Sequence, residues 1–180
     1  KIFRENNLKS TNISELPKSI LIVFGGSDIY NLTQLYSEYI VDLNMFDKIN
    51  IITGSGYKYL NELKLYLIKN EGKNIFHFHN VTSEKIKQLA IESDIAIAPS
   101  STILLELLFL KKAVISGYYV DNQINIYNGF AELDLIFKFG NFNNISNLKN
   151  LLSSISILDL NRLIPNLQNT FNNKIDLRIK

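Results

Sequence analysis

The chain has 180 residues, a formal net charge of +2 and no cysteine. This length suits one domain with a single hydrophobic core. The absence of cysteine excludes disulfides and thiolate metal sites, and it fits a reducing cytoplasm, where we expect the protein to work. The small net charge does not favour nucleic-acid binding, and no apolar run approaches the ~18 residues of a membrane helix. We therefore expect no nucleic-acid partner and no membrane span.

Short apolar segments alternate with helical patterns along most of the chain. Six apolar segments predict strands, namely Ile20–Phe24, Ile49–Thr53, Asn74–Phe78, Ile95–Ala98, Ala113–Ser116 and Leu135–Phe139. Their continuous apolar character is typical of strands that are buried on both faces of a parallel sheet. Apolar spacings of three and four predict helices over Leu32–Leu43, Tyr57–Lys69, Ser83–Glu92 and Thr102–Leu110. The alternation predicts a three-layer, Rossmann-like α/β domain with a parallel sheet of about six strands.

The two ends of the chain differ from this alternation. Residues 1–18 are polar and predict a linker or strap, which leaves residues 19–180 as the Rossmann-like domain. The segment from Asn143 to Asn173 predicts two further helices, broken near Ser153–Ser156 and kinked around Pro165.

The turn after the first predicted strand is the first candidate binding element. Ligands of open α/β sheets bind beyond the carboxyl ends of the strands, and Gly25, Gly26 and Ser27 stand at this position. Glycines let the backbone approach an anion, and the following helix, which Asn31 is expected to cap, presents N–H groups. The pattern is neither a GxGxxG fingerprint nor a P-loop. A tight strand-to-helix turn without a ligand is the alternative.

Two other strand ends carry weaker signals. Gly54–Gly56 follow the second strand and are interpreted as a plain turn. His77 and His79 lie on one face of the third strand, but a metal site needs a third ligand, and none is near in sequence. Neither histidine has a Ser or Cys nucleophile beside it. We therefore predict no metal site and no catalytic nucleophile here.

The turn after the fourth strand is the most informative. Ser100 and Ser101 follow Pro99, and Thr102 begins the next helix. Ser101 is expected to cap that helix, while neighbouring N–H groups and hydroxyls remain available to a phosphate.

Glu106 lies one helical turn after Thr102, on the same helix face. It is a lone carboxylate among apolar residues, and an unpaired buried carboxylate is costly, so it must reach a partner or solvent. A carboxylate below an anion-binding helix start is well placed to accept hydrogen bonds from a ribose diol. An ion pair with Lys111 or Lys112 is the alternative.

Polar side chains also follow the fifth strand. Asp121, Asn122 and Gln123 offer hydrogen-bond donors and acceptors of the kind that sugar hydroxyls and N-acyl groups need. Asp121 is alternatively the cap of the next helix.

The segments "GGSD…NLT", "SDIAIA…SST…LE" and "DNQ", in this order, resemble the C-terminal half of the UDP-sugar hydrolase of the pseudaminic-acid pathway. That family, the UDP-2,4-diacetamido-2,4,6-trideoxy-β-L-altropyranose hydrolases, is similar in turn to the nucleotide-binding half of GT-B glycosyltransferases of the MurG type. The resemblance covers Ser19 to Phe139.

The resemblance implies a role for each matched residue. Gly25, Gly26 and Ser27 would line the diphosphate side of the cleft; Ser100, Ser101 and Thr102 would hold the phosphates; Glu106 would hold the ribose; Asn122 and Gln123 would hold the sugar. Many relatives carry Gly-Gly where this chain has two serines, which restricts the backbone near the phosphate.

The resemblance also implies a partner. GT-B enzymes react their substrate between two Rossmann-like halves, and in the hydrolases the catalytic His belongs to the N-terminal half. Neither histidine of this chain matches that motif. We therefore expect no catalytic residue and no cofactor here, a UDP-sugar ligand, and an N-terminal half within a longer polypeptide. A glycosyltransferase donor half and a non-catalytic assembly module are the alternative functions.

Overall fold

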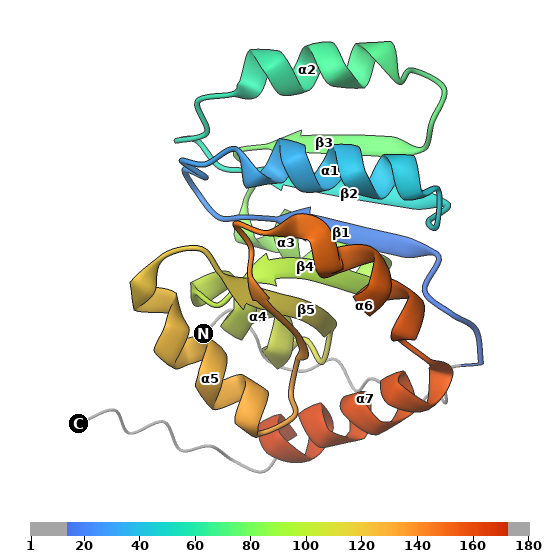
Figure 1. Cartoon of the computed structure of the whole chain (residues 1–180), viewed down its shortest axis with the longest axis vertical. Helices are drawn as coiled ribbons and strands as arrows, with labels where there is room; N and C mark the ends of the chain where they lie inside the picture. Colours follow the sequence, from blue (N-terminus) through green and yellow to red (C-terminus); the bar gives the residue numbers. More distant parts are fainter. Residues whose placement is uncertain (1–13, 173–180) are drawn as a thin grey trace.

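One parallel sheet of six strands organises the computed structural model, which describes residues 14–172. The strands are β1 (Ser19–Val23), β2 (Lys48–Thr53), β3 (Ile75–His79), β4 (Ile95–Pro99), β5 (Ala113–Tyr118) and β6 (Phe137–Asn141). Their order across the sheet is β3-β2-β1-β4-β5-β6, and all neighbouring pairs are parallel. Figure 1 shows the strands running in one direction, with their carboxyl ends at the left of the view.

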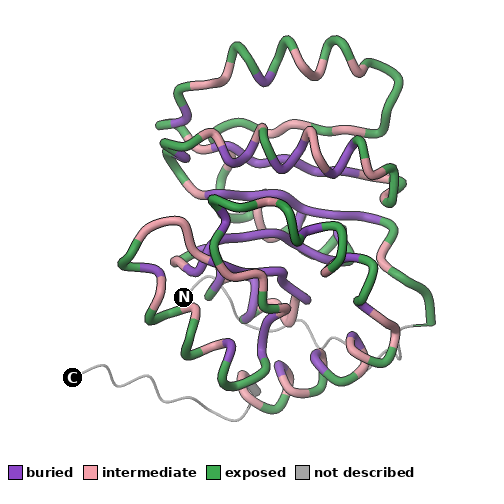
Figure 2. Tube along the Cα trace, viewed as in Figure 1, coloured by how far each residue is buried: buried purple, intermediate pink, exposed green. Residues whose placement is uncertain are grey.

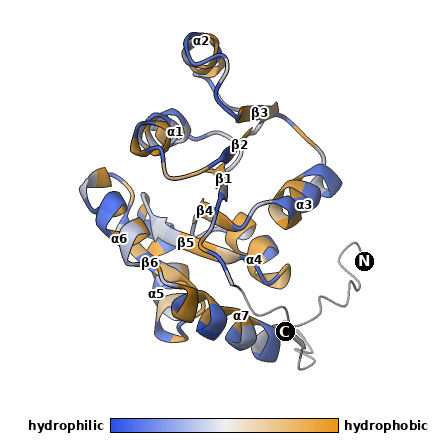
Figure 3. Ribbon diagram, turned by 90° about the vertical axis from the view of Figure 1, so that its right-hand side faces the viewer, coloured by the Kyte–Doolittle hydropathy of each residue, from blue (hydrophilic) through white to orange (hydrophobic). Residues whose placement is uncertain are grey.

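Helices cover both faces of the sheet. They are α1 (Leu32–Leu43), α2 (Leu60–Lys69), α3 (Ser83–Glu92), α4 (Thr102–Phe109), α5 (Ile124–Glu132), α6 (Leu148–Ser154) and α7 (Ile157–Asn172), with short 3-10 turns η1 (Asp121–Gln123) and η2 (Ile145–Asn147). Figure 3 shows α1, α2 and α6 on one side of the sheet and α3, α4, α5 and α7 on the other. None of the helices within residues 14–172 has the length and apolar character that a membrane span requires.

The predicted fold class is confirmed. Six parallel strands with helices on both faces form the expected Rossmann-like domain. The main shift is at the last strand, which the sequence predicts from Leu135 but which begins at Phe137. Leu135 and Ile136 have the apolar character of a strand because they are buried in the connection that precedes it. Two helices follow as predicted, separated at residues 155–156, and α7 continues through Pro165 without a break. Residues 1–13 of the predicted linker lie outside the described residues.

The core is centred on β1 and β4. Every residue of these two strands is buried, because each strand has a neighbour on both edges and helices over both faces. Figure 2 shows this buried centre against the largely exposed α2, of which only Leu63 is buried. An aromatic group of Phe24, Tyr36 and Phe142 packs on the α1 face, with ring centroids 5.0–5.3 Å apart.

The start of α1 corrects one prediction. Asn31 occupies the N-cap position, in a left-handed conformation with φ 55°, but its side chain makes no capping bond. The buried carboxylate of Asp28 takes that role instead, accepting from Leu32 N at 2.9 Å and from Thr33 N at 2.7 Å. The amide of Asn31 is engaged by Gln34 and by the Tyr57 hydroxyl. Two orphan N–H groups of the helix are thus satisfied from within the preceding turn.

Replacement of Asp28 with alanine is expected to lower the free energy of unfolding by about 1–2 kcal/mol, because two buried backbone N–H groups lose their acceptor. The exposed Asp121 makes no capping bond to η1, so Asp121→Ala serves as the matched control and is expected to change stability by less than about 0.5 kcal/mol. Urea denaturation of both variants checks the difference. Equal stability of the two variants would contradict the capping role of Asp28.

Candidate functional site

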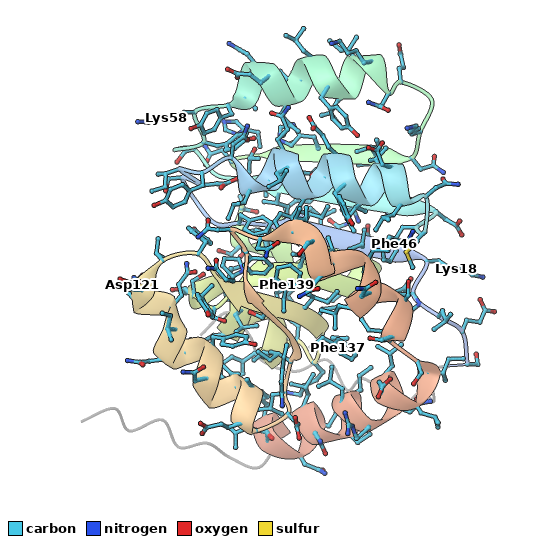
Figure 4. The ribbon with its side chains drawn as sticks, viewed as in Figure 1. Lys18, Phe46, Lys58, Asp121, Phe137 and Phe139 are labelled. Atoms are coloured by element: carbon cyan, nitrogen blue, oxygen red, sulfur yellow. The ribbon has the colours of Figure 1, made fainter. Side chains whose placement is uncertain are left out.

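A pocket of about 360 Å³ opens at the carboxyl ends of β1, β2 and β4. Its wall combines Gly25 and Gly26 after β1, Gly54 after β2, and Ser101 and Thr102 at the start of α4. Figure 4 marks this end of the sheet by Lys58 and Asp121, with Lys18 and Phe46 at the opposite end. The pocket therefore lies at the edge where parallel α/β sheets bind their ligands.

Backbone packing between two loops forms one wall of the pocket. Gly56 N donates to Gly26 O at 3.0 Å, and a Cβ placed on Gly54 would lie 2.5 Å from both the Cα and the carbonyl oxygen of Gly26. Only glycine at position 54 allows this approach. Gly25 adopts φ 91°, a left-handed conformation that favours glycine. The turn after β2, interpreted from the sequence as plain, is thus part of the pocket wall.

Three tyrosine hydroxyls hold the loop between β1 and α1 in place. Tyr57 donates to the Asn31 side chain, Tyr59 donates to Ile29 O at 3.1 Å, and Tyr119 donates to Phe24 O at 3.3 Å. Burial raises the pKa of the Tyr119 hydroxyl, which keeps it a neutral donor. The loop that carries Gly25 and Gly26 is therefore fixed from the β2 side and from the β5 side.

Glu106 lies in the pocket, one turn into α4, and is half-buried. Within residues 14–172 its carboxylate forms no hydrogen bond or ion pair. The alternative, an ion pair between Glu106 and Lys111 or Lys112, is not formed within the described residues. Lys111 Nζ donates to Phe109 O at 3.2 Å, and the ammonium of Lys112 donates to Ser93 O. The carboxylate is thus available to a ligand.

The two serines after β4 have different environments. Ser101 lines the pocket and occupies the N-cap position of α4, as predicted, but its side chain makes no capping hydrogen bond. Ser100 is fully buried, and its hydroxyl lies 3.0 Å from that of Ser116, which donates to Ala98 O. The Ser100 hydroxyl therefore ties β4 to β5 and lies outside the pocket lining.

Three other predicted residues do not line the pocket. Ser27 and Asn122 are exposed, and Gln123 is buried with its Oε1 accepting from Tyr119 N at 3.0 Å. The sugar-binding role of Asn122 and Gln123 and the phosphate role of Ser27 stay predictions. The pocket gathers Gly25, Gly26, Ser101, Thr102 and Glu106 out of the predicted set.

The third strand contributes residues that the sequence reasoning missed. Asn80 and Val81, which follow β3, line the pocket together with Thr53 of β2 and Ile86 of α3. Asn80 has φ 49° and donates its N–H to Thr53 O at 2.8 Å, which continues the parallel pairing of β3 with β2 to the pocket edge. Asn80 and Val81 directly follow β3, so the rule that ligands bind beyond the carboxyl ends of parallel strands points to them as well. Nothing local in the sequence marks Ile86.

The two histidines of β3 converge on the Thr53 hydroxyl. Thr53 Oγ1 lies 2.8 Å from His77 Nε2 and 3.0 Å from His79 Nδ1. Burial, then His79 and Lys64, lowers the pKa of His77 to about 4. Within the described residues no group of three His, Asp or Glu side chains is arranged to hold a metal ion.

The pocket lining holds one ionisable side chain, that of Glu106, and no Lys, Arg or His of the described residues. Positive potential in the pocket therefore comes from backbone N–H groups, above all those at the start of α4. Apolar side chains, Val23, Ile52 and Ile103 among them, complete the wall. Such a mixture suits a ligand with an anionic part, hydroxyls and a flat or apolar part.

Comparisons with known proteins show the fold. MurG from Acinetobacter baumannii superimposes with a TM-score of 0.59 at 14% identity, over 87% of this chain and 46% of MurG. A UDP-N-acetylglucosamine 2-epimerase gives a TM-score of 0.53 at 11% identity, over 82% of this chain and 37% of the epimerase. The chain has the fold of one GT-B half. It spans less than half the length of either protein.

Sequence comparison yields a relative without an assigned activity. The uncharacterized protein MJ1062 of Methanocaldococcus jannaschii is 30% identical over 117 residues, which are 64% of this chain and 24% of that protein. No protein-family model matches the chain.

Replacement of Gly54 with alanine is expected to lower the free energy of unfolding by about 1–3 kcal/mol, because the new Cβ meets the backbone of Gly26. Gly129→Ala is the matched control. An added Cβ there meets nothing within 4 Å inside α5, so this variant is expected to gain about 0.5–1 kcal/mol. Thermal denaturation of the two variants should shift in opposite directions, and a shift of the same sign would contradict the close loop contact.

Proposed function

We propose that this chain is the UDP-sugar-binding domain of a sugar-nucleotide hydrolase of the nonulosonic, pseudaminic-acid type. The observation that carries the proposal is the pocket at the carboxyl edge, which joins a glycine wall, a helix start and the carboxylate of Glu106, unpartnered within residues 14–172. In this proposal the protein works in the cytoplasm.

The pocket supplies groups that match the diphosphate and the ribose of a nucleotide diphosphate. N–H groups at the start of α4, with the Ser101 and Thr102 hydroxyls, would hold the diphosphate against the bare backbone of Gly25 and Gly26. Glu106, one turn further along α4, would accept hydrogen bonds from the ribose hydroxyls. The epimerase that superimposes on this chain is named for UDP-N-acetylglucosamine, which supports a nucleotide sugar as the ligand class.

The proposed parent reaction is hydrolysis of the bond between the sugar's anomeric carbon and UDP. Water would attack the anomeric carbon, the carbon–oxygen bond to the β-phosphate would break, and UDP would leave. A base in an N-terminal half would take the proton from the water, so this domain would contribute binding and orientation. Asn122 and Gln123 would then face the sugar across the domain cleft, as the "DNQ" resemblance implies.

A second candidate is the donor half of a GT-B glycosyltransferase, which the MurG likeness favours. It uses the same pocket but delivers the sugar to an acceptor instead of water. A non-catalytic assembly module has less support, because it requires Glu106 to be held by a lysine, and both candidate lysines bond elsewhere.

Calorimetric titration of the chain with UDP tests the proposal. We expect saturable binding to the unmodified chain and at least about tenfold weaker binding to Glu106→Gln, because a carboxylate acceptor of two ribose hydroxyls is lost. Glu132→Gln is the matched control, since Glu132 is an exposed helical glutamate on α5 that does not line the pocket.

Each outcome bears on the nucleotide pocket, which the hydrolase and the glycosyltransferase candidates share. Equal weakening by both substitutions would contradict a ribose contact at Glu106. Absence of UDP binding to the unmodified chain would contradict the proposal that this chain binds UDP by itself. If UDP binds, titration with UDP-N-acetylglucosamine then shows whether the attached sugar adds affinity.

A further inference from the structure

The sheet ends at β3, whose outer edge has no neighbouring strand among the described residues. In a parallel pair, alternate residues of a strand bond to the neighbour. Asn74 O accepts from β2 at 2.9 Å and Asn80 N donates to β2 at 2.8 Å, so the even-numbered residues of this segment face β2. His77 and His79 therefore direct their backbone N–H and C=O groups outward. The edge presents backbone donors and acceptors that no strand of the described chain uses.

The opposite edge of the sheet is protected from pairing, whereas β3 is not. β6 carries the exposed Lys138, a register shift against β5, and Gly140 with φ 92°. A lysine and a bulge are common devices that keep an edge strand from pairing with another chain. β3 has the sequence Ile-Phe-His-Phe-His, without lysine, acid, glycine or proline, and its register with β2 is regular throughout. β3 therefore has the features of an edge that can accept another strand.

Exposed apolar side chains flank this edge on both faces of the sheet. Phe76 is 44% exposed and points to the α3 face, as does its β2 neighbour Asn50, whose amide donates to the C-cap residue of α3. On the other face, the charge of Lys64 acts on His77, which places that side of α2 beside β3. Ile68 lies one turn after Lys64 and is 67% exposed. In a single chain both apolar side chains remain in water.

We propose that β3 pairs antiparallel with β3 of a second copy of this chain, about a two-fold axis at His77, and so joins the two sheets into one. This register sets His77 opposite itself, Ile75 opposite His79, and Phe76 opposite Phe78. The outward N–H and C=O groups of His77 would bond to those of its copy, and His79 N–H would donate to Ile75 O. This inference does not rest on the proposed function.

The strand is complementary to itself in this register. Phe76 and Phe78 of both copies would form one aromatic cluster on the α3 face, and aromatic pairs directly opposite each other stabilise antiparallel strands. On the other face His77 meets its own copy. Burial, then His79 and Lys64, lowers the pKa of His77 to about 4, so two neutral rings meet at neutral pH and no like charges repel.

Charges at the two ends of β3 are also complementary. Glu71 and Lys73 precede the strand, whereas Glu84 and Lys85 follow it. Antiparallel pairing brings the start of one strand beside the end of the other. Lys73 then approaches Glu84 of the second copy, and Glu71 approaches Lys85. Two-fold symmetry forms each of these pairs twice, which favours a second copy of this chain as the occupant of the edge.

Analytical ultracentrifugation from low micromolar to several hundred micromolar concentration tests the association. We expect the mass to rise with concentration from the 20.6 kDa of one chain towards twice that value. Phe76→Lys should weaken the association at least about tenfold, because a charge replaces an aromatic ring in the contact. Leu158→Lys is the matched control, since Leu158 is 80% exposed on α7, at the other end of the molecule, and this variant should associate like the unmodified chain.

Hydrogen exchange of the backbone amides shows whether β3 is the paired strand. The N–H groups of His77 and His79 face solvent in the single chain and should exchange fast when the sample is dilute. Their protection should rise with concentration in the unmodified chain and stay low in Phe76→Lys. Ile68→Lys, on the exposed side of α2, is a second variant that should weaken the association if Phe76→Lys does not fold.

Three results would overturn the proposal. The first is a chain that stays monomeric at every concentration. The second is an association that Phe76→Lys and Leu158→Lys weaken equally. The third is a dimer in which the amides of His77 and His79 still exchange fast, because that dimer does not pair through β3. None of these results bears on UDP binding, since the paired edge of β3 does not line the pocket.

Discussion

The reversal of strand order at β1 is the constraint on which the rest of the structure depends. β1 pairs with β2 on one edge and with β4 on the other. The helix after β1, α1, and the helix after β4, α4, lie on opposite faces of the sheet. Right-handed crossovers make this divergence unavoidable, because α1 and α4 must follow their strands on different sides. The loops after β1 and β4 therefore separate, and the pocket forms between them.

The pocket is stiff because backbone and hydroxyl contacts replace flexible side chains in its wall. Gly26 packs directly on Gly54, and three tyrosine hydroxyls bond the loop that carries Gly25 and Gly26. A wall of this kind loses little conformational freedom when a ligand binds, which favours affinity without large buried area. The same rigidity makes the site sensitive to a single added Cβ.

The pocket lining carries a single ionisable side chain among the described residues. That side chain is Glu106, so the remaining polarity comes from backbone groups, hydroxyls and the Asn80 amide. A hydrolase and a glycosyltransferase would both use this arrangement, since they differ in the group that attacks the sugar rather than in the nucleotide site. In the proposed function that group belongs to a second, GT-B-like half; the chain itself spans 46% of MurG.

The sequence by itself determined the elements, their alternation and the class of fold, because apolar periodicity depends on neighbours within a few residues. It also placed Gly25, Ser101 and Glu106 at strand ends or on a helix face, where the parallel-sheet rule puts ligands. Tertiary structure alone decided that adjacent Ser100 and Ser101 differ, since the register of β4 with β5 puts Ser116 beside the first. It likewise decided that Thr53 meets His77 and His79, residues 24 and 26 positions away, because that contact exists only once β2 and β3 pair.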